Sequence, residues 1–139
     1  MVVAAAHEAK QGGARQVTLW GSGRPRREFL LSDDMAAACV FLMRLPDSGF
    51  DRLVAPARAP LINVGAGEDQ SIAELAALIA EVLGYRGEFV YDAAKPDGTP
   101  RKLLDVSRLA ALGWKPKAAL REGIALAYRD FLRRFAAAA

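Results

Sequence analysis

The centre of this chain contains a helix whose two ends are both marked in the sequence. Ser71 and Glu74 form the Ser-x-x-Glu pattern of a capping box, in which each side chain accepts a hydrogen bond from a free backbone N–H at the helix start. Gly84 stands where many helices end in a left-handed residue. Between these ends, one face carries the apolar residues Ile72, Leu75, Ile79, Val82 and Leu83. The pattern predicts a helix that packs on a core with one face.

Short apolar segments with the composition of strands lie on both sides of this helix. They span residues 17–20, 27–31, 61–64 and 88–91. Strands that alternate with helices predict an α/β domain. The 139 residues are 53% hydrophobic and 25% charged, which fits one globular domain with a core.

Three further helices are predicted. They run from a cap at Asp33 or Asp34 to about Leu45, from a cap at Asp105 to Gly113, and from about Ala118 to Phe135. The first of them is apolar nearly all round, so it is predicted to be buried, and Cys39 with it. Residues 46–60 read as a connector.

The two ends of the chain are predicted to be weakly structured. Residues 1–15 read as an Ala-rich helix followed by a linker, in which His7 is expected at a surface or interface. Residues 136–139 read as a frayed tail.

Charge and cysteine content narrow the functional classes. The lone Cys39 excludes a disulfide framework and a cysteine metal site, and no residues stand out as metal ligands. The net charge of +3 comes from scattered cations, so we do not expect a nucleic-acid partner. No apolar run is long enough to span a bilayer and no signal-peptide pattern opens the chain, so a cytoplasmic protein with no membrane partner is expected.

Two short loops combine Gly and Pro with several cations. The first basic loop is Trp20–Arg27 (WGSGRPRR) and the second is Lys95–Lys102 (KPDGTPRK). Such loops can bring their backbone close to a ligand while directing fixed positive charge at it. Together they predict a site for a di-anionic ligand, most simply a diphosphate. Trp20 either stacks on a planar base or sugar or packs in the core, and both readings stay open.

Two motifs suggest cofactor chemistry but read as coincidences. Residues 65–67 (Gly-Ala-Gly) resemble the opening of a dinucleotide fingerprint, but the third glycine position holds Gln70 and Ser71 already caps the helix. Tyr91 and Lys95 have the Tyr-x-x-x-Lys spacing of short-chain dehydrogenases, a pair that works on one face of a helix. Pro96 disfavours a helix at Lys95, so no catalytic residue is predicted.

A set of longer motifs carries a family resemblance over residues 7–135. The motifs are VTLWGSG at 17–23, REFL at 27–30, DDMA at 33–36, INVG at 62–65, KPDGTPRKLLDV at 95–106 and LGW at 112–114. Together they resemble GDP-L-fucose synthases, which are extended short-chain dehydrogenases. The octet KPDGTPRK is the most specific of these motifs.

The resemblance implies a division of labour. In the family, an N-terminal Rossmann half binds NADP(H) and carries the catalytic groups, and a small C-terminal α/β domain binds the GDP-sugar. The family converts GDP-4-keto-6-deoxy-mannose to GDP-L-fucose by epimerisation and NADPH-dependent reduction. We therefore expect a C-terminal substrate-binding domain at residues 16–135, without the Rossmann half, inactive by itself and binding no NADP(H) alone. The alternatives are a free-standing nucleotide-sugar binding module, or a fragment without ligand function that depends on a partner such as a separate Rossmann half.

The resemblance also implies four substrate-binding residues. They are Trp20, Arg27, Asp97 and Lys102. Arg27 and Lys102 would lie near the diphosphate or sugar, and Asp97 on a nucleotide hydroxyl or base edge. Asp97 can also be read as stabilising its Pro-Asp-Gly turn. Arg24 and Arg26 depart from the family, which usually has uncharged residues there, and they add positive charge beside the expected diphosphate.

Overall fold

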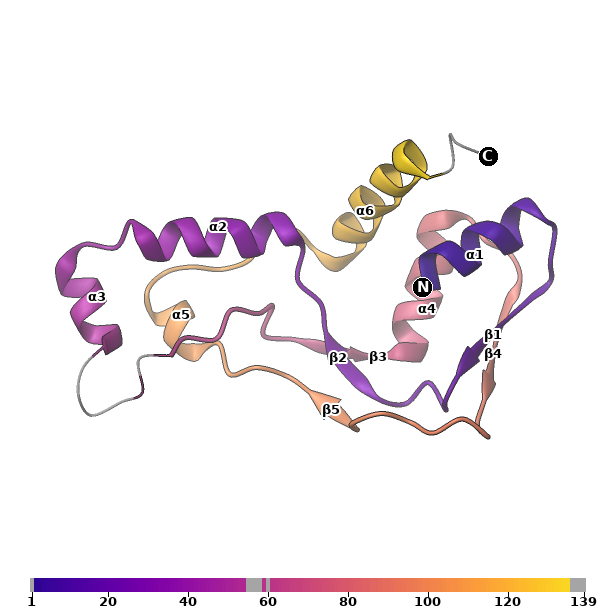
Figure 1. Ribbon diagram of the computed structural model, residues 1–139, viewed down its shortest axis with the longest axis horizontal. Coiled ribbons are helices and arrows are strands. Elements are labelled where there is room, and N and C mark those ends of the chain that lie inside the picture. Colours follow the sequence, from indigo (N-terminus) through magenta and orange to yellow (C-terminus); the bar gives the residue numbers. More distant parts are fainter. Residues whose placement is uncertain (1, 55–58, 60, 136–139) are drawn as a thin grey trace.

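The computed structural model describes residues 2–54, 59 and 61–135, which form helices and two small sheets (Figure 1). The helices are α1 (Val2–Gln11), α2 (Ser32–Met43), α3 (Asp47–Val54), α4 (Ile72–Leu83), α5 (Ser107–Ala111) and α6 (Leu120–Arg134). The strands are β1 (Gln16–Trp20), β2 (Arg26–Glu28), β3 (Asp69–Ser71), β4 (Glu88–Asp92) and β5 (Arg101–Lys102). The predicted frayed tail at 136–139 lies outside the described residues.

The central helix, α4, forms as predicted. The Ser71 hydroxyl oxygen accepts the backbone N–H of Glu74 at 3.1 Å, and the Glu74 carboxylate accepts the N–H of Ser71 at 2.7 Å. Gly84 ends the helix with a left-handed φ of 67°. Three members of the predicted apolar face, Leu75, Ile79 and Leu83, are buried. They form a core with Ala6 of α1 and Ile124 of α6.

The capping box gives a direct test of this part of the fold. Replacing Ser71 by alanine removes the acceptor for the Glu74 N–H and should lower the free energy of unfolding by about 1 kcal/mol. Urea denaturation followed by circular dichroism measures the change. Ser48→Ala on exposed α3 is the control and should leave the midpoint within error of the unmodified chain. Equal shifts for the two variants would contradict the role assigned to the cap.

The N-terminal segment is more ordered than its composition predicted. Its alanines let α1 lie close to α4, and Ala6 and Ala9 are buried there. His7 is only 8% exposed, and its Nδ1 lies 2.9 Å from the hydroxyl oxygen of Tyr128 on α6. The prediction of weak structure is therefore wrong for α1, because α1 packs on α4. Of the two expectations for His7, a surface or an interface, the surface is excluded, because the imidazole lies where α1 meets α6 and has Tyr128 as a polar partner.

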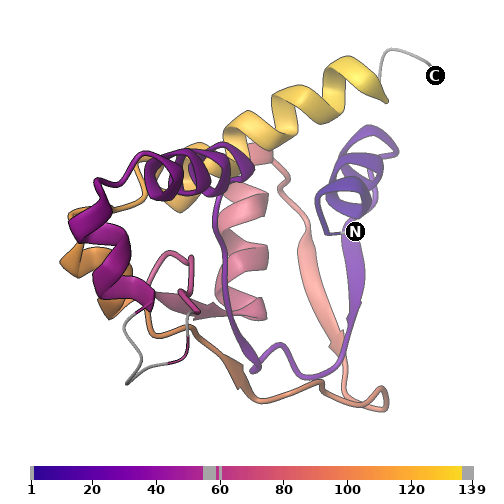
Figure 2. The same ribbon diagram turned by 60° about the vertical axis from the view of Figure 1, so that its left-hand side comes forward.

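The predicted burial of the second helix is also wrong. Within α2 only Asp34 and Ala38 are buried, and Cys39 is exposed. In both views α2 lies far from α1, and it extends away from the α1–α4 core towards α3 (Figures 1 and 2). Asp34 does not cap its own helix, because its Oδ2 accepts the N–H groups of Lys117 and Ala118 at 3.1 and 2.9 Å.

The strands of the described structure form two sheets. β1 and β4 pair in parallel with Val17 opposite Phe89, and β2 lies between antiparallel β3 and parallel β5. Residues 61–64 form no strand. The predicted connector contains α3, and its residues 55–58 and 60 lie outside the described part of the chain. Asp105 is the predicted cap of α5, but Val106 holds the cap position; Asp105 stands one residue earlier, and its Oδ1 accepts the Ser107 N–H at 2.9 Å.

Candidate functional site

The two basic loops lie together, as the sequence predicted for a shared site. The Ser22 backbone N–H donates to Asp97 Oδ1 at 2.8 Å, and the Ser22 hydroxyl donates to Asp97 Oδ2 at 2.6 Å. These bonds from the Ser22 hydroxyl and backbone lower the pKa of the Asp97 carboxyl group. Asp97 thus bonds directly to the first loop. The prediction that it stabilises its own Pro-Asp-Gly turn did not include this contact.

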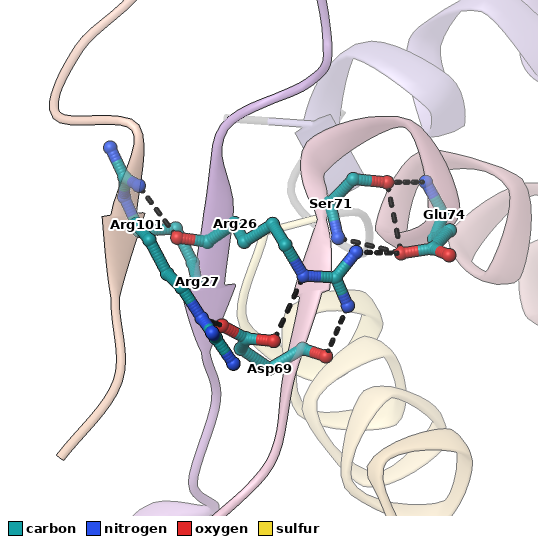
Figure 3. Close-up of polar contacts among 6 residues, drawn as sticks. All are labelled: Arg26, Arg27, Asp69, Ser71, Glu74 and Arg101. Atoms are coloured by element: carbon teal, nitrogen blue, oxygen red, sulfur yellow. Dashed lines mark hydrogen bonds and ion pairs between the residues drawn. The ribbon is translucent and has the colours of Figure 1, made fainter.

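The first loop leads into β2 and the second into β5. These two strands pair, and their register places four cations on two opposite faces. In the parallel register of β2 and β5, Arg26 lies opposite Arg101 and Arg27 opposite Lys102. Because side chains alternate along a strand, Arg26 and Arg101 share one face, and Arg27 and Lys102 share the other. Figure 3 shows Arg26 and Arg101 directed at Asp69, while the Arg27 guanidinium lies away from it.

One of these faces is a structural ion-pair cluster. The Asp69 side chain is only 4% exposed, and its two oxygens accept from Arg26 Nε at 2.9 Å and from Arg101 Nε (Figure 3). Arg26 also donates to the backbone oxygen of Asp69 at 2.7 Å and pairs with Glu74 at 3.2 Å. Hydrogen bonds from Arg101 and Arg26 lower the pKa of Asp69. The sequence suggested that Arg26 adds positive charge beside a ligand. In the structure this charge is instead paired with Asp69 and Glu74.

The opposite face carries two cations, the half-buried Arg27 and the exposed Lys102. Among the described residues, neither Arg27 nor Lys102 forms an ion pair. The Arg27 guanidinium is held in place, because its Nη1 donates to the Arg26 backbone oxygen at 2.6 Å. Its Nη2 lies beside Gly98 of the second loop, 3.3 Å from where a Cβ would stand. We call the surface formed by Arg27, Lys102 and Gly98 the cationic face.

Trp20, at the end of β1, resolves one open alternative. Its side chain is 74% exposed, which rules out the core-packing reading. The Lys95 ammonium group lies 5.4 Å from the centroid of the indole ring, a cation–π contact between the two basic loops. The indole is therefore available at the surface, in the strand that leads into the first loop.

Sequence reasoning missed two acidic residues that organise the region. Asp69 is bound by both Arg26 and Arg101, and Glu28 accepts the N–H groups of Gly67 and Leu104 at 2.6 and 3.2 Å. Glu28 stands in the REFL motif, but no local pattern indicates the bonds of either residue, which depend on how β2, β3 and β5 come together.

The glycine turn at 65–67 does not fit a dinucleotide. A pyrophosphate site at a helix start needs free backbone N–H groups. The Gly67 N–H already donates to the Glu28 carboxylate, and Ser71 and Glu74 cap the start of α4. The carboxylates at this turn would also repel a pyrophosphate. No NADP step can therefore be assigned to this turn.

The Tyr-x-x-x-Lys spacing is coincidental, as predicted. Tyr91 lies on β4 and Lys95 in the turn beyond it, so the two do not share a helix face. Burial raises the pKa of Tyr91, the opposite of the shift that a catalytic lysine would cause. The ring of Tyr91 lies against Gly23, 2.6 Å from where a Cβ would stand, which gives it a packing role.

The described residues show neither a membrane-spanning helix nor a cluster of metal ligands. No helix in that part of the chain is long and apolar enough to cross a membrane. Nor does it contain a group of three His, Cys, Asp or Glu side chains placed to hold a metal ion.

Comparison with known proteins gives matches of sequence and of fold. A model of the NAD dependent epimerase/dehydratase family matches residues 1–57. A putative GDP-L-fucose synthase 2 from Arabidopsis thaliana is 51% identical over 126 residues, which is 91% of this chain and 35% of the relative. The GDP-L-fucose synthase of Escherichia coli (strain K12) is 52% identical over 126 residues, 91% of this chain and 39% of the relative. The chain thus spans little more than a third of these relatives.

A solved structure extends the comparison to the fold. MlghC, a GDP-mannoheptose C4 reductase from Campylobacter jejuni solved with NADP bound, superposes with a TM-score of 0.76 and is 32% identical. The match covers 92% of this chain and 42% of that chain. It confirms the predicted α/β architecture over less than half the length of that structure.

Proposed function

Because this chain is homologous to one part of the GDP-L-fucose synthases of the NAD dependent epimerase/dehydratase family, we propose that it is the part that binds the nucleotide-sugar substrate. The observation that carries the proposal is the cationic face. Arg27 and Lys102 are paired in register on β2 and β5 and have no carboxylate partner among the described residues. Two adjacent cations of this kind suit the two phosphates of a nucleoside diphosphate.

The proposed binding mode uses three side chains in distinct roles. The Arg27 guanidinium and the Lys102 ammonium group bind the diphosphate. The exposed Trp20 indole offers a flat apolar surface on which the base can stack. All three belong to residues 16–135, which we propose as the GDP-sugar binding domain. Asp97, in the second loop, is bonded to Ser22 of the first loop.

The reaction of the whole enzyme is part of the same proposal. With a Rossmann half that binds NADP(H), the assembly would convert GDP-4-keto-6-deoxy-mannose to GDP-L-fucose by epimerisation and reduction. Residues of this chain bind and orient the nucleotide, and the proton and hydride transfers belong to the other half. A Rossmann half is therefore the partner that we propose.

Calorimetric titration of the purified chain tests the proposal. We expect saturable binding of GDP-mannose and no response to NADPH. A well-folded sample, shown by circular dichroism and a cooperative urea transition, that binds neither ligand would overturn it. Binding of NADPH with no binding of GDP-mannose would overturn it as well.

A second candidate, a fragment that depends on a partner and has no ligand function, is favoured by the surface of α2 and α3. Met35, Val40, Met43 and Phe50 are 41, 40, 76 and 53% exposed. Exposed apolar side chains gathered on neighbouring elements promote association. This candidate predicts oligomers or aggregates in light scattering, and a monodisperse monomer that binds GDP-mannose would contradict it.

A further inference from the structure

We propose that Glu28 is a positioning residue that fixes Lys102 opposite Arg27 on the cationic face. The inference rests on the proposed function for its ligand, whereas the contacts that carry it belong to the free chain. Glu28 is the last residue of β2 and follows Arg27 directly. Its carboxylate accepts the backbone N–H groups of Gly67 and Leu104, which lie 39 and 76 residues further along the chain.

Lys102 is attached to β2 on both of its sides. Before it in the chain, the backbone oxygen of Pro100 accepts the N–H of Arg26 at 2.8 Å. After it, the N–H of Leu104 donates to Glu28 Oε2 at 3.2 Å. The described chain between β5 and α5 is irregular, so the Glu28 side chain binds the backbone where the strand pairing of β5 ends. The carboxylate thus limits how far Lys102 can move away from β2.

The glycine turn at 65–67 is shaped to receive this carboxylate. Glu28 Oε1 accepts the Gly67 N–H at 2.6 Å. Gly65 is buried, and a Cβ built on it would overlap Oε1 and stand 2.7 Å from Oε2. A larger residue at position 65 would therefore displace the carboxylate. The motif that resembles a dinucleotide fingerprint thus anchors one oxygen of Glu28, while the other oxygen holds the chain beyond β5.

The charge and the place of Glu28 indicate that it acts through the backbone of β5. Side chains alternate along β2, so Glu28 lies on the face opposite Arg27 and Lys102. Among the described residues it forms no ion pair, so it does not neutralise either cation. A carboxylate near a diphosphate repels it, and removal of that charge alone would strengthen GDP binding. Loss of a positioning residue would weaken GDP binding instead, because Lys102 would no longer be held opposite Arg27.

Two measurements on Glu28→Ala test the inference: amide hydrogen exchange at Leu104 in the free chain, and calorimetric affinity for GDP. Exchange should speed up and affinity should fall by about tenfold each, the effect of losing one hydrogen bond to a charged group. Gly65→Ala, which displaces the carboxylate without removing it, should change both in the same direction. The control is Glu68→Ala, which removes an exposed carboxylate beside the same turn and should neither speed exchange at Leu104 nor weaken GDP binding.

A conservative variant keeps the test decisive if Glu28→Ala does not fold. Glu28→Gln retains one acceptor oxygen, so its amide can hold only one of the two N–H groups. Exchange should then be faster at Gly67 or at Leu104, and GDP affinity should lie below that of the unmodified chain. Circular dichroism checks the fold of each variant. A folded Glu28→Gln with unchanged exchange at both sites and unchanged affinity would contradict the inference.

A double-mutant cycle separates positioning from a direct or general effect. In a Lys102→Ala background, Glu28→Ala should cause at most about a twofold further loss of GDP affinity, because the cation that it positions is gone. A full further loss would overturn the inference, and so would GDP binding that is unchanged or stronger in Glu28→Ala alone. Unchanged exchange at Leu104 would overturn it as well. If the folded, unmodified chain binds no GDP, the proposed function fails, and the exchange comparison alone decides whether Glu28 holds the chain beyond Lys102.

Discussion

Arg27→Ala is expected to weaken GDP binding by about tenfold or more, the effect of losing charge-assisted hydrogen bonds to a phosphate. The guanidinium is held beside Gly98 by its bond to the Arg26 backbone oxygen, so the free chain already places it for a ligand. Lys102→Ala should have a similar effect, because Lys102 lies opposite Arg27 in the strand pairing. Calorimetric titration with GDP measures both changes.

The control for this prediction is an exposed arginine outside both basic loops. Arg86→Ala removes the same charge from the turn between α4 and β4, away from both basic loops, and should leave GDP affinity within about twofold. Circular dichroism of each variant should match the unmodified chain, since none of the three side chains forms an ion pair among the residues described. If Arg86→Ala weakens GDP binding as much as Arg27→Ala does, GDP is attracted by the overall positive charge of the chain and the cationic face is not its binding site.

Asp69→Ala is expected to have the largest effect on stability among the polar substitutions considered. It leaves Arg26 and Arg101 close together without the carboxylate that both bind, and of the bonds between Arg26 and residue 69 only the one to the backbone oxygen remains. The urea midpoint should fall further than in Ser71→Ala, which removes one cap. Asp69→Asn, which keeps the shape but not the charge, should lie between the unmodified chain and Asp69→Ala. A midpoint for Asp69→Ala above that of Ser71→Ala would contradict the role given to the cluster.

The same cluster gives stability a defined dependence on pH. The pKa values of Asp69 and Glu74 are lowered in the folded chain, by Arg101 and Arg26 for Asp69 and mainly by Ser71 for Glu74. A lowered pKa contributes stability that is fully present above the unfolded value, about 4, and is lost as pH falls through the folded value. The advantage of the unmodified chain over Asp69→Ala should thus stay constant above about pH 5 and shrink below it. Urea titrations at several pH values measure it, and an advantage that grew on acidification would contradict the account.

Local signals in the sequence were enough for the elements with complete patterns. The capping box, the apolar face and Gly84 together predicted α4, and β1 and β4 were found from their apolar residues. Each of these patterns is contained in one stretch of chain. By contrast, the apolar composition of α2 indicated a covered helix, but composition does not state what covers it. In the described structure α2 extends away from the core, and most of its side chains remain exposed.

For the candidate site too, some features follow from local sequence and others only from the folded chain. The two loops and their glycines could be read from the sequence, and the family resemblance predicted Trp20, Arg27 and Lys102 as substrate-binding residues. Which arginines pair with Asp69 and which one stays free of ion pairs could not be predicted from the sequence, because this depends on strand register. A shift of one residue would exchange Arg26 with Arg27, and the ion pair with Asp69 would then involve the other side chain. The direct bonds between Ser22 and Asp97 likewise exist only in the folded chain.

The central claim is that Arg27 and Lys102 recognise a diphosphate beside an aromatic surface at Trp20. Calorimetric titration of the unmodified chain with GDP and, separately, with guanosine tests it most directly, because the two ligands share the base and ribose and differ in the diphosphate. The account predicts saturable GDP binding and guanosine binding at least about a hundredfold weaker, the loss of two charge-assisted contacts. Equal affinities for the two ligands, or no binding of GDP by a folded sample, would contradict it.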